Sequence, residues 1–152
     1  MFLIRALDNE YLAELKEKVL NCFTGASVAS GARLEYKWRD RSYAPMKNNA
    51  ALAGLFKHNL ESLGRHVEAF DPRFGFGSTD MGNVSQVVPS IHPTIAIASP
   101  EVFIHTQEFA SAAASEAGHE GLMDAAKAMA MTVADILQPG MLDMIKQEFY
   151  SG

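Results

Sequence analysis

Five histidines are the side chains of this chain with the widest chemical range: His58, His66, His92, His105 and His119. A zinc ion in a protein takes three or four ligands, and a two-metal hydrolase site also needs a bridging carboxylate. No histidines stand at metal-ligand spacing, and the chain has neither a His-x-Asp nor a Glu-Glu dipeptide. Met123 occupies the place where a His-Glu-x-x-His motif starting at His119 needs its second histidine. The residues alone therefore predict no complete metal site.

A polar stretch at residues 77–94, "GSTDMGNVSQVVPSIHPT", is the second candidate for chemistry. A phosphate-binding interpretation fails, because no Gly-Lys-Ser/Thr follows and Gly75-Phe76-Gly77 lacks a third glycine at dinucleotide spacing. The chain also has no Gly-x-Ser-x-Gly elbow for a nucleophilic serine. Two interpretations stay open on the residues alone: a loop that grips a ligand, or a capped turn before a buried strand.

Composition narrows the class of protein. The 152 residues are 48% hydrophobic and 20% charged, as in one ordinary globular domain. A net charge of -5 argues against a nucleic-acid or anionic-membrane surface. Cys22 is the only cysteine, which excludes an intrachain disulfide and indicates a reducing compartment. With no adequate signal-peptide core and no run of about 18 apolar residues, we expect a cytoplasmic protein.

The first forty residues have a β-α-β pattern. Residues 2–5 form a short apolar strand candidate, and Asp8 or Asn9 can cap a helix over residues 10–30. In residues 33–39, "RLEYKWR", apolar and charged side chains alternate as in a half-buried strand. The pattern breaks at residues 40–45, which we interpret as a hinge.

The rest of the chain predicts helices mixed with short strands. Asn48 or Asn49 can cap a helix over residues 50–64, and strands are expected at 67–70 and within 93–100. A strong helix is expected over residues 121–138, and a short helix closes the chain. The apolar stripe of the strong helix comprises Leu122, Ala125, Met129, Val133 and Ile136. The predicted fold class is α/β, in the broader α+β sense.

Four blocks resemble one family in order and spacing: "YAPMKNNAALAGLF", "GSTDMGNVSQVVPSIHP", "HTQEFASAAASEAGHEG" and "AAKAMAMTVADIL". The family is the aminoacylase/carboxypeptidase-type metallopeptidases, in particular the branch of p-aminobenzoyl-glutamate hydrolase, dipeptidases and amidohydrolases. The resemblance implies an α/β catalytic domain with two zinc ions, interrupted by a lid that usually mediates dimerisation. It matches the C-terminal portion of such enzymes. Residues 1–42 then correspond to the second half of the lid, and residues 43–152 to the C-terminal part of the catalytic domain.

The same resemblance assigns site residues. His105, in "IHTQEFA", matches a metal ligand of the family, whereas a lone histidine after an apolar strand is otherwise a hydrogen-bonded core residue. The loop from Gly77 to Ser85 resembles a segment that lines the substrate cleft. The implied substrate-binding candidates are Ser78, Thr79, Asp80, Asn83 and His92. The family's His-x-Asp ligands, bridging aspartate and Glu-Glu pair with the general base have no counterpart in this chain.

The resulting expectation is a C-terminal fragment of a zinc-dependent amidohydrolase or dipeptidase, inactive alone. Its intact counterpart would hydrolyse amide bonds of N-acyl amino acids, aminobenzoyl-glutamate or dipeptides. The alternative is a non-catalytic interaction module, either a gene remnant or one chain of a split enzyme. In either case we expect a homo-oligomer, joined through the edge of residues 33–39, or a complex with an N-terminal partner chain. An unrelated small α/β protein is the third reading, and the ordered blocks argue against it.

Overall fold

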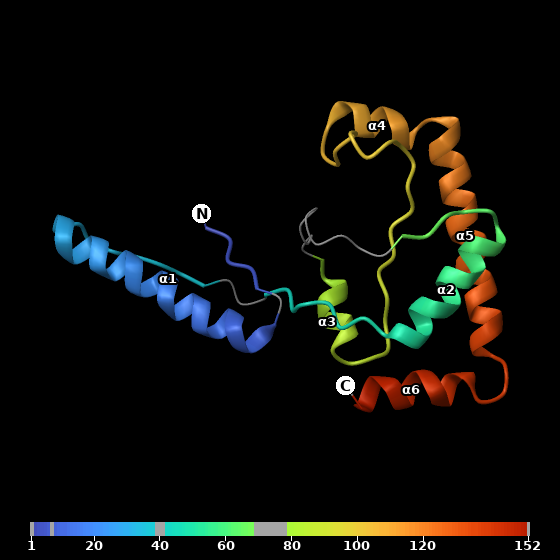
Figure 1. The fold of residues 1–152 in the computed structure, drawn as a ribbon. Helices are drawn as coiled ribbons and strands as arrows, with labels where there is room; N and C mark the ends of the chain where they lie inside the picture. Colours follow the sequence, from blue (N-terminus) through green and yellow to red (C-terminus); the bar gives the residue numbers. More distant parts are fainter. Residues whose placement is uncertain (1, 7, 39–41, 69–78, 152) are drawn as a thin grey trace. The chain divides into compact units, whose positions relative to one another are not determined.

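The computed structural model describes residues 2–6, 8–38, 42–68 and 79–151. In these ranges the chain forms helices α1 (Asn9–Ser30), α2 (Ala50–Ser62), α3 (Met81–Ser85), α4 (Gln107–Ala113), α5 (Glu116–Ile136) and α6 (Met141–Ser151), drawn in Figure 1. Two compact units result: Met1–Lys47 with Gly77–Val87, and Asn48–Phe76 with Val88–Gly152. The predicted domain division between residues 42 and 43 concerns a longer family protein and stays a prediction. Within the described ranges, no helix is both long and apolar enough to cross a membrane.

Helix α1 begins and ends where its sequence predicts. Asp8 is extended, and its side chain accepts a 2.6 Å hydrogen bond from the backbone N–H of Tyr11. This bond satisfies one of the N–H groups that the first turn leaves free. Gly31 ends the helix in the left-handed region, at φ 72°, where glycine has no β-carbon to clash. On this helix Leu12 is buried, whereas Cys22 is exposed.

The segments expected to be strands are not part of any sheet among the described residues. Residues 2–5, 33–38 and 93–100 have no strand assignment, and the one β-bridge there joins Asn48 and Ser90 in parallel. An extended segment becomes a strand only when a neighbour completes its hydrogen-bond ladder. Residues 39, 69 and 70, the ends of two predicted strands, lie outside the described ranges. The α/β class therefore stays a prediction, with its helices in place and its sheet unformed within the described ranges.

The second unit is built around the packing of α2 on α5, which lie side by side in Figure 1. Phe56 and Leu60 of α2 and Ala128 of α5 form the buried cluster. Beside them, Asn59 donates to the Thr132 hydroxyl at 3.1 Å and to the Asp135 carboxylate at 2.7 Å. Buried polar groups are tolerated when they are paired in this way. The two helices are thus held by apolar contact and by one polar network.

Helix α6 closes the start of α2. The predicted cap residue Asn49 accepts from the N–H of Leu52 at 2.9 Å and donates to the Ile145 carbonyl at 3.0 Å. The carboxylate of Glu148 in α6 accepts from the N–H of Ala50 at 2.7 Å and of Ala51 at 2.8 Å. These carboxyl and amide groups satisfy the first turn of α2 and complement its positive dipole end.

The apolar stripe predicted for α5 is wrong as a description of its packed face. Leu122, Met129 and Val133 are 65%, 56% and 56% exposed. The face that packs inward is instead made of small residues: Gly118, Gly121, Ala128 and Thr132 are its buried members. Hydrophobic periodicity identifies the apolar faces of a helix, but it does not show which face is packed. Small residues form the packed face of α5 because they allow another element to approach closely.

Candidate functional site

The polar loop turns its middle side chains onto its own chain. Asn83 accepts from the backbone N–H of Ala44 at 3.1 Å and donates to the Ser42 carbonyl at 3.1 Å. Gln86 donates to the Pro45 carbonyl at 2.8 Å. The Asn83 amide thus accepts from one peptide group and donates to another, as a paired peptide group does in a β-sheet. Asn83 therefore holds Ser42 and Ala44, which lie in the segment 40–45 that we interpreted as a hinge.

A buried serine and a glycine complete this attachment. The hydroxyl of Ser85 is fully buried, accepts from the N–H of Lys47 at 2.9 Å and donates to the Gly82 carbonyl at 2.7 Å. A β-carbon on Gly82 would lie 1.8 Å from the carbonyl oxygen of Ala44. Gly82 is thus needed for space, because its backbone must touch residue 44. The candidates named from the sequence include Asn83 but neither Ser85 nor Gln86.

The loop candidates Thr79 and Asp80 directly precede α3, which begins at Met81. The hydroxyl of Thr79 accepts from the N–H of Met81 at 3.2 Å, whereas the side chain of Asp80 makes no capping bond and is exposed. Ser78 lies outside the described residues. The substrate-binding roles of Ser78, Thr79, Asp80 and Asn83 stay predictions; Asp80 and Asn83 are both exposed, and Thr79 is half-buried.

His105 stands out by its backbone. At φ 67° it is the one non-glycine residue in the left-handed region within the described ranges. It directly precedes Thr106, whose hydroxyl accepts from the N–H of Phe109 at 3.2 Å and caps α4. The imidazole is exposed. The left-handed region costs a residue with a β-carbon about 1 kcal/mol, and such conformations gather at functional sites.

The acidic residues nearest to His105 in sequence are Glu101 and Glu108. The side-chain hydrogen bond of Ser99, together with a backbone hydrogen bond, lowers the pKa of the Glu101 carboxyl. Phe103 and Ile104, which lead into His105, are 66% and 63% exposed. His92, the remaining candidate, is exposed in the same unit as His105, whereas the loop of α3 belongs to the other unit.

The donor set does not fit a complete metal centre. Among the described residues, no three histidine, cysteine, aspartate or glutamate side chains are placed to hold one metal ion. His105 can donate one ring nitrogen to a metal, but zinc needs at least three protein ligands. The remaining ligands of a zinc site would therefore have to come from outside the described residues.

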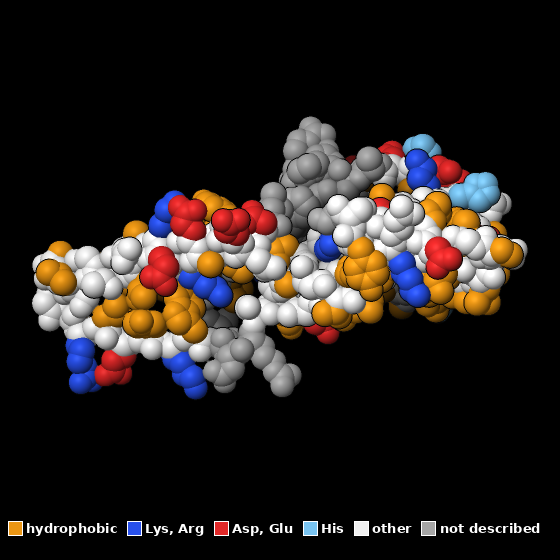
Figure 2. Space-filling view, turned by 90° about the horizontal axis from the view of Figure 1, so that it is seen from below, with side chains coloured by type: hydrophobic (Ala, Val, Ile, Leu, Met, Phe, Trp, Pro, Cys, Tyr) orange, Lys and Arg blue, Asp and Glu red, His pale blue; other side chains and the backbone are white. Residues whose placement is uncertain are grey.

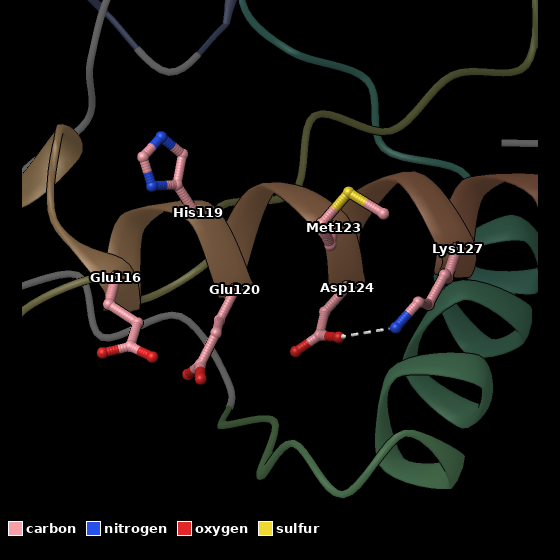
Figure 3. A pocket seen from close by; sticks show the side chains of 6 residues that line it. All are labelled: Glu116, His119, Glu120, Met123, Asp124 and Lys127. Carbon is pink, nitrogen blue, oxygen red and sulfur yellow. Dashed lines mark ion pairs between the residues drawn. The ribbon is translucent and has the colours of Figure 1, made fainter.

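A shallow depression on α5 is the other candidate site. Its lining residues all come from one helix, as Figure 3 shows: Glu116, His119, Glu120, Met123, Asp124 and Lys127. Glu116, Glu120 and Asp124 point to one side of the helix, and His119 points to the other. Lys127 pairs with Asp124 at 3.7 Å. Because its carboxylates and imidazole diverge, the depression is a solvated helix surface and not a ligand cavity.

Comparison with known proteins gives the functional context. The chain is 34% identical to a human protein and 32% identical to a mouse protein, in each case over 98% of its own length. Both relatives are Xaa-Arg dipeptidases. No protein-family model matches the chain. The chain spans 35% of the length of each relative, so the similarity supports kinship with dipeptidases and concerns about a third of such a protein.

Proposed function

We propose that this chain is the C-terminal portion of a metal-dependent dipeptidase, with His105 as one ligand of a zinc site. The observation that carries the proposal is the similarity over 98% of the chain to two Xaa-Arg dipeptidases. Their name points to dipeptides that end in arginine as the first substrates to test. N-acyl amino acids and aminobenzoyl-glutamate are the substrates suggested by the wider family resemblance.

The conformation of His105 supports its role. A ligand histidine must present one ring nitrogen outward, and an exposed imidazole just before the cap of α4 does so. Its left-handed φ of 67° is a cost that glycine would avoid. A histidine at such a position is explained if the side chain serves a site. A zinc ion bound there would polarise the amide carbonyl and lower the pKa of a bound water.

Catalysis requires more than this chain holds. The general base and the other ligands expected in the family have no counterpart in the sequence, so we expect no hydrolysis by the chain alone. The purified chain, incubated with zinc and with a dipeptide ending in arginine, should release no free arginine above a blank. Zinc-dependent turnover that a chelator abolishes would contradict this expectation.

The experiment that tests the proposal is a chimera. The aligned region of the human Xaa-Arg dipeptidase is replaced with residues 1–152, and hydrolysis of a dipeptide ending in arginine is measured. We expect an active chimera in which His105→Ala lowers kcat/KM by about 100-fold or more, as for the loss of a metal ligand. His58→Ala, at an exposed position of α2, is the matched control and should leave kcat/KM unchanged. Equal activity of the two variants would exclude His105 as a ligand.

The non-catalytic alternative has one observation in its favour. In residues 33–38, Tyr36 and Trp38 are 59% and 43% exposed, and their rings meet edge to face at 6.1 Å. An extended, aromatic, unpaired segment can add to the edge of another sheet. Association of two chains through this segment stays a prediction. Light scattering on the wild type and on Tyr36→Lys would test it, because a monomer in both would exclude the edge as an interface.

A further inference from the structure

The segment 42–47, which leads from α1 to α2, is held by side chains of α3 and of the residue after it. The segment runs alongside α3 in Figure 1. Four hydrogen bonds each join one side chain to one backbone group of the segment. In a β-sheet such backbone groups would pair with the backbone of a neighbouring strand. A side chain can instead rotate away alone, so one part of the segment can be released while the rest stays bound.

The attachment at Lys47 is the fixed one. The Ser85 hydroxyl accepts from the Lys47 N–H at 2.9 Å and donates to the Gly82 carbonyl at 2.7 Å. Ser85 has no exposed surface, so water cannot take the place of either partner while α3 is folded. Breaking a buried hydrogen bond leaves its donor and acceptor unpaired, which costs more than the loss of an exposed bond. Lys47 therefore stays anchored to α3.

The attachments nearer to α1 are the weak ones. Asn83 accepts from the Ala44 N–H at 3.1 Å and donates to the Ser42 carbonyl at 3.1 Å. Gln86 donates to the Pro45 carbonyl at 2.8 Å. Asn83 and Gln86 are both exposed, so water can replace each of these bonds at a small net cost. The two amides can therefore let go of the backbone without disturbing the buried anchor.

Long-range attraction between charges does not explain how the segment is held. On the face drawn in Figure 2, the described acidic and basic side chains are scattered among hydrophobic ones. Charges of both signs that are interspersed in this way exert little net attraction beyond the screening length of about 8 Å. The restraint on the segment 42–47 is therefore assigned to its hydrogen bonds.

We propose that Asn83 and Gln86 are positioning residues, whose amides form a releasable catch on residues 42–45 with its pivot at Lys47. When the catch is closed, the connection from α1 is held from Ser42 onward. When it is open, the free tether extends to Lys47, and a longer tether lets the two units take more arrangements. Asn83 then acts through the backbone that it holds and not through contact with a substrate. The catch itself does not depend on the proposed function; its effect on substrate affinity does.

Hydrogen exchange in the 152-residue chain tests the catch. In Asn83→Ala the Ala44 amide should exchange about 10-fold faster, because it loses its acceptor. The Lys47 amide should stay within about twofold of the wild type. Alanine is a better helix former than asparagine, so unfolding of α3 would not explain the change. Asn83→Asp keeps an acceptor for Ala44 and should restore slow exchange. Val84→Ala, at the exposed neighbouring position, is the matched control.

Distances between labels on the two units test the positioning role. Cys22 on α1 is exposed and is the only cysteine of the sequence, and His58→Cys adds a second exposed site on α2. Electron paramagnetic resonance of the doubly spin-labelled chain gives the distribution of distances. Asn83→Ala and Gln86→Ala should each broaden this distribution, because the span of a free tether grows with its length. Val84→Ala should leave the width unchanged.

Kinetics of the chimeric dipeptidase test the effect on substrate affinity. A wider range of arrangements leaves a smaller fraction of molecules competent to bind, and the apparent affinity falls by that fraction. Asn83→Ala and Gln86→Ala should therefore both raise KM, by about threefold, and leave kcat within about twofold. An inactive chimera, found together with the expected exchange and distances, supports the catch and contradicts the proposed function.

Three results would overturn the proposal. The first is an Ala44 amide whose exchange is the same in Asn83→Ala as in the wild type. The second is a label distribution that neither Asn83→Ala nor Gln86→Ala broadens. The third is an active chimera in which Gln86→Ala leaves KM unchanged, because a rise in Asn83→Ala alone would make Asn83 a substrate contact.

Discussion

Gly82 lies so close to Ala44 that a β-carbon on Gly82 would stand 1.8 Å from the Ala44 carbonyl oxygen. This contact joins the polar loop to residues 42–47, which come later in the sequence than α1. Asn83 and Ser85 hold the same segment by hydrogen bonds, so the three residues act together. The loop therefore has a structural role, which is to hold residues 44–47, and this role is independent of any ligand.

Gly82→Ala should separate the loop from residues 42–47. The added methyl group meets backbone, which cannot rotate away, so we expect a loss of about 3 kcal/mol in the stability of this contact. Hydrogen exchange of the Ala44 and Lys47 amides should accelerate accordingly. Gly25→Ala in α1 is the control, because nothing lies within 4 Å of its added β-carbon, and it should stabilise the helix by about 1 kcal/mol. Unchanged exchange in Gly82→Ala would show that the contact is not maintained in solution.

Asn59→Ala should destabilise the packing of α2 on α5. It removes both donors of the buried amide and leaves Thr132 and Asp135 without that partner. The expected loss in the free energy of unfolding is about 2 kcal/mol, measured by urea denaturation. Lys57→Ala, which removes an exposed ion pair with Glu61 at 3.7 Å, should cost less than about 0.5 kcal/mol. Similar costs for the two variants would refute a special role for Asn59.

Helices α1 and α2 and their N-caps could be predicted from sequence because the signals are local, whereas α3, α4 and the first turn of α5 were not predicted. Asp8 and Asn49 cap the helices as their side chains and positions predict. The choice between the two apolar faces of α5 could not be predicted, since Leu122 and Val133 have the stronger periodicity while Gly121 and Ala128 permit the close approach. Which face of α5 is buried depends on the elements of the chain that pack against it, and these are distant in sequence.

The candidate site shows the same division. His105 could be identified only through its block "IHTQEFA". Its positive φ could not be foreseen, because histidine, although enriched in the left-handed region, still adopts it in a small minority of cases. The long-range attachments of Asn83 and Glu148 join residues 39 and 98 positions apart. No local pattern encodes such separations.

Glu148→Ala should loosen the start of α2. Its two carboxylate oxygens accept from Ala50 and Ala51, and loss of a charged cap costs about 1–2 kcal/mol. Glu148→Gln keeps one acceptor oxygen and should cost about half as much. Exchange of the Ala50 and Ala51 amides reports the effect directly. Gln147→Ala, at the exposed preceding position, should leave both amides protected; if it exposes them equally, the capping role is wrong.

His105→Gly and His105→Val separate the backbone of residue 105 from its imidazole. Both variants remove the ring, but glycine accepts φ 67° whereas a β-branched residue does not. His105→Val should therefore be less stable than His105→Gly by about 1–2 kcal/mol in urea denaturation of the 152-residue chain. In the chimeric dipeptidase, both variants should lose activity to a similar extent, because a metal ligand is missing in each. Activity retained in His105→Gly would assign the importance of this position to the turn alone, and equal stability of the two variants would show that the left-handed conformation is not present in solution.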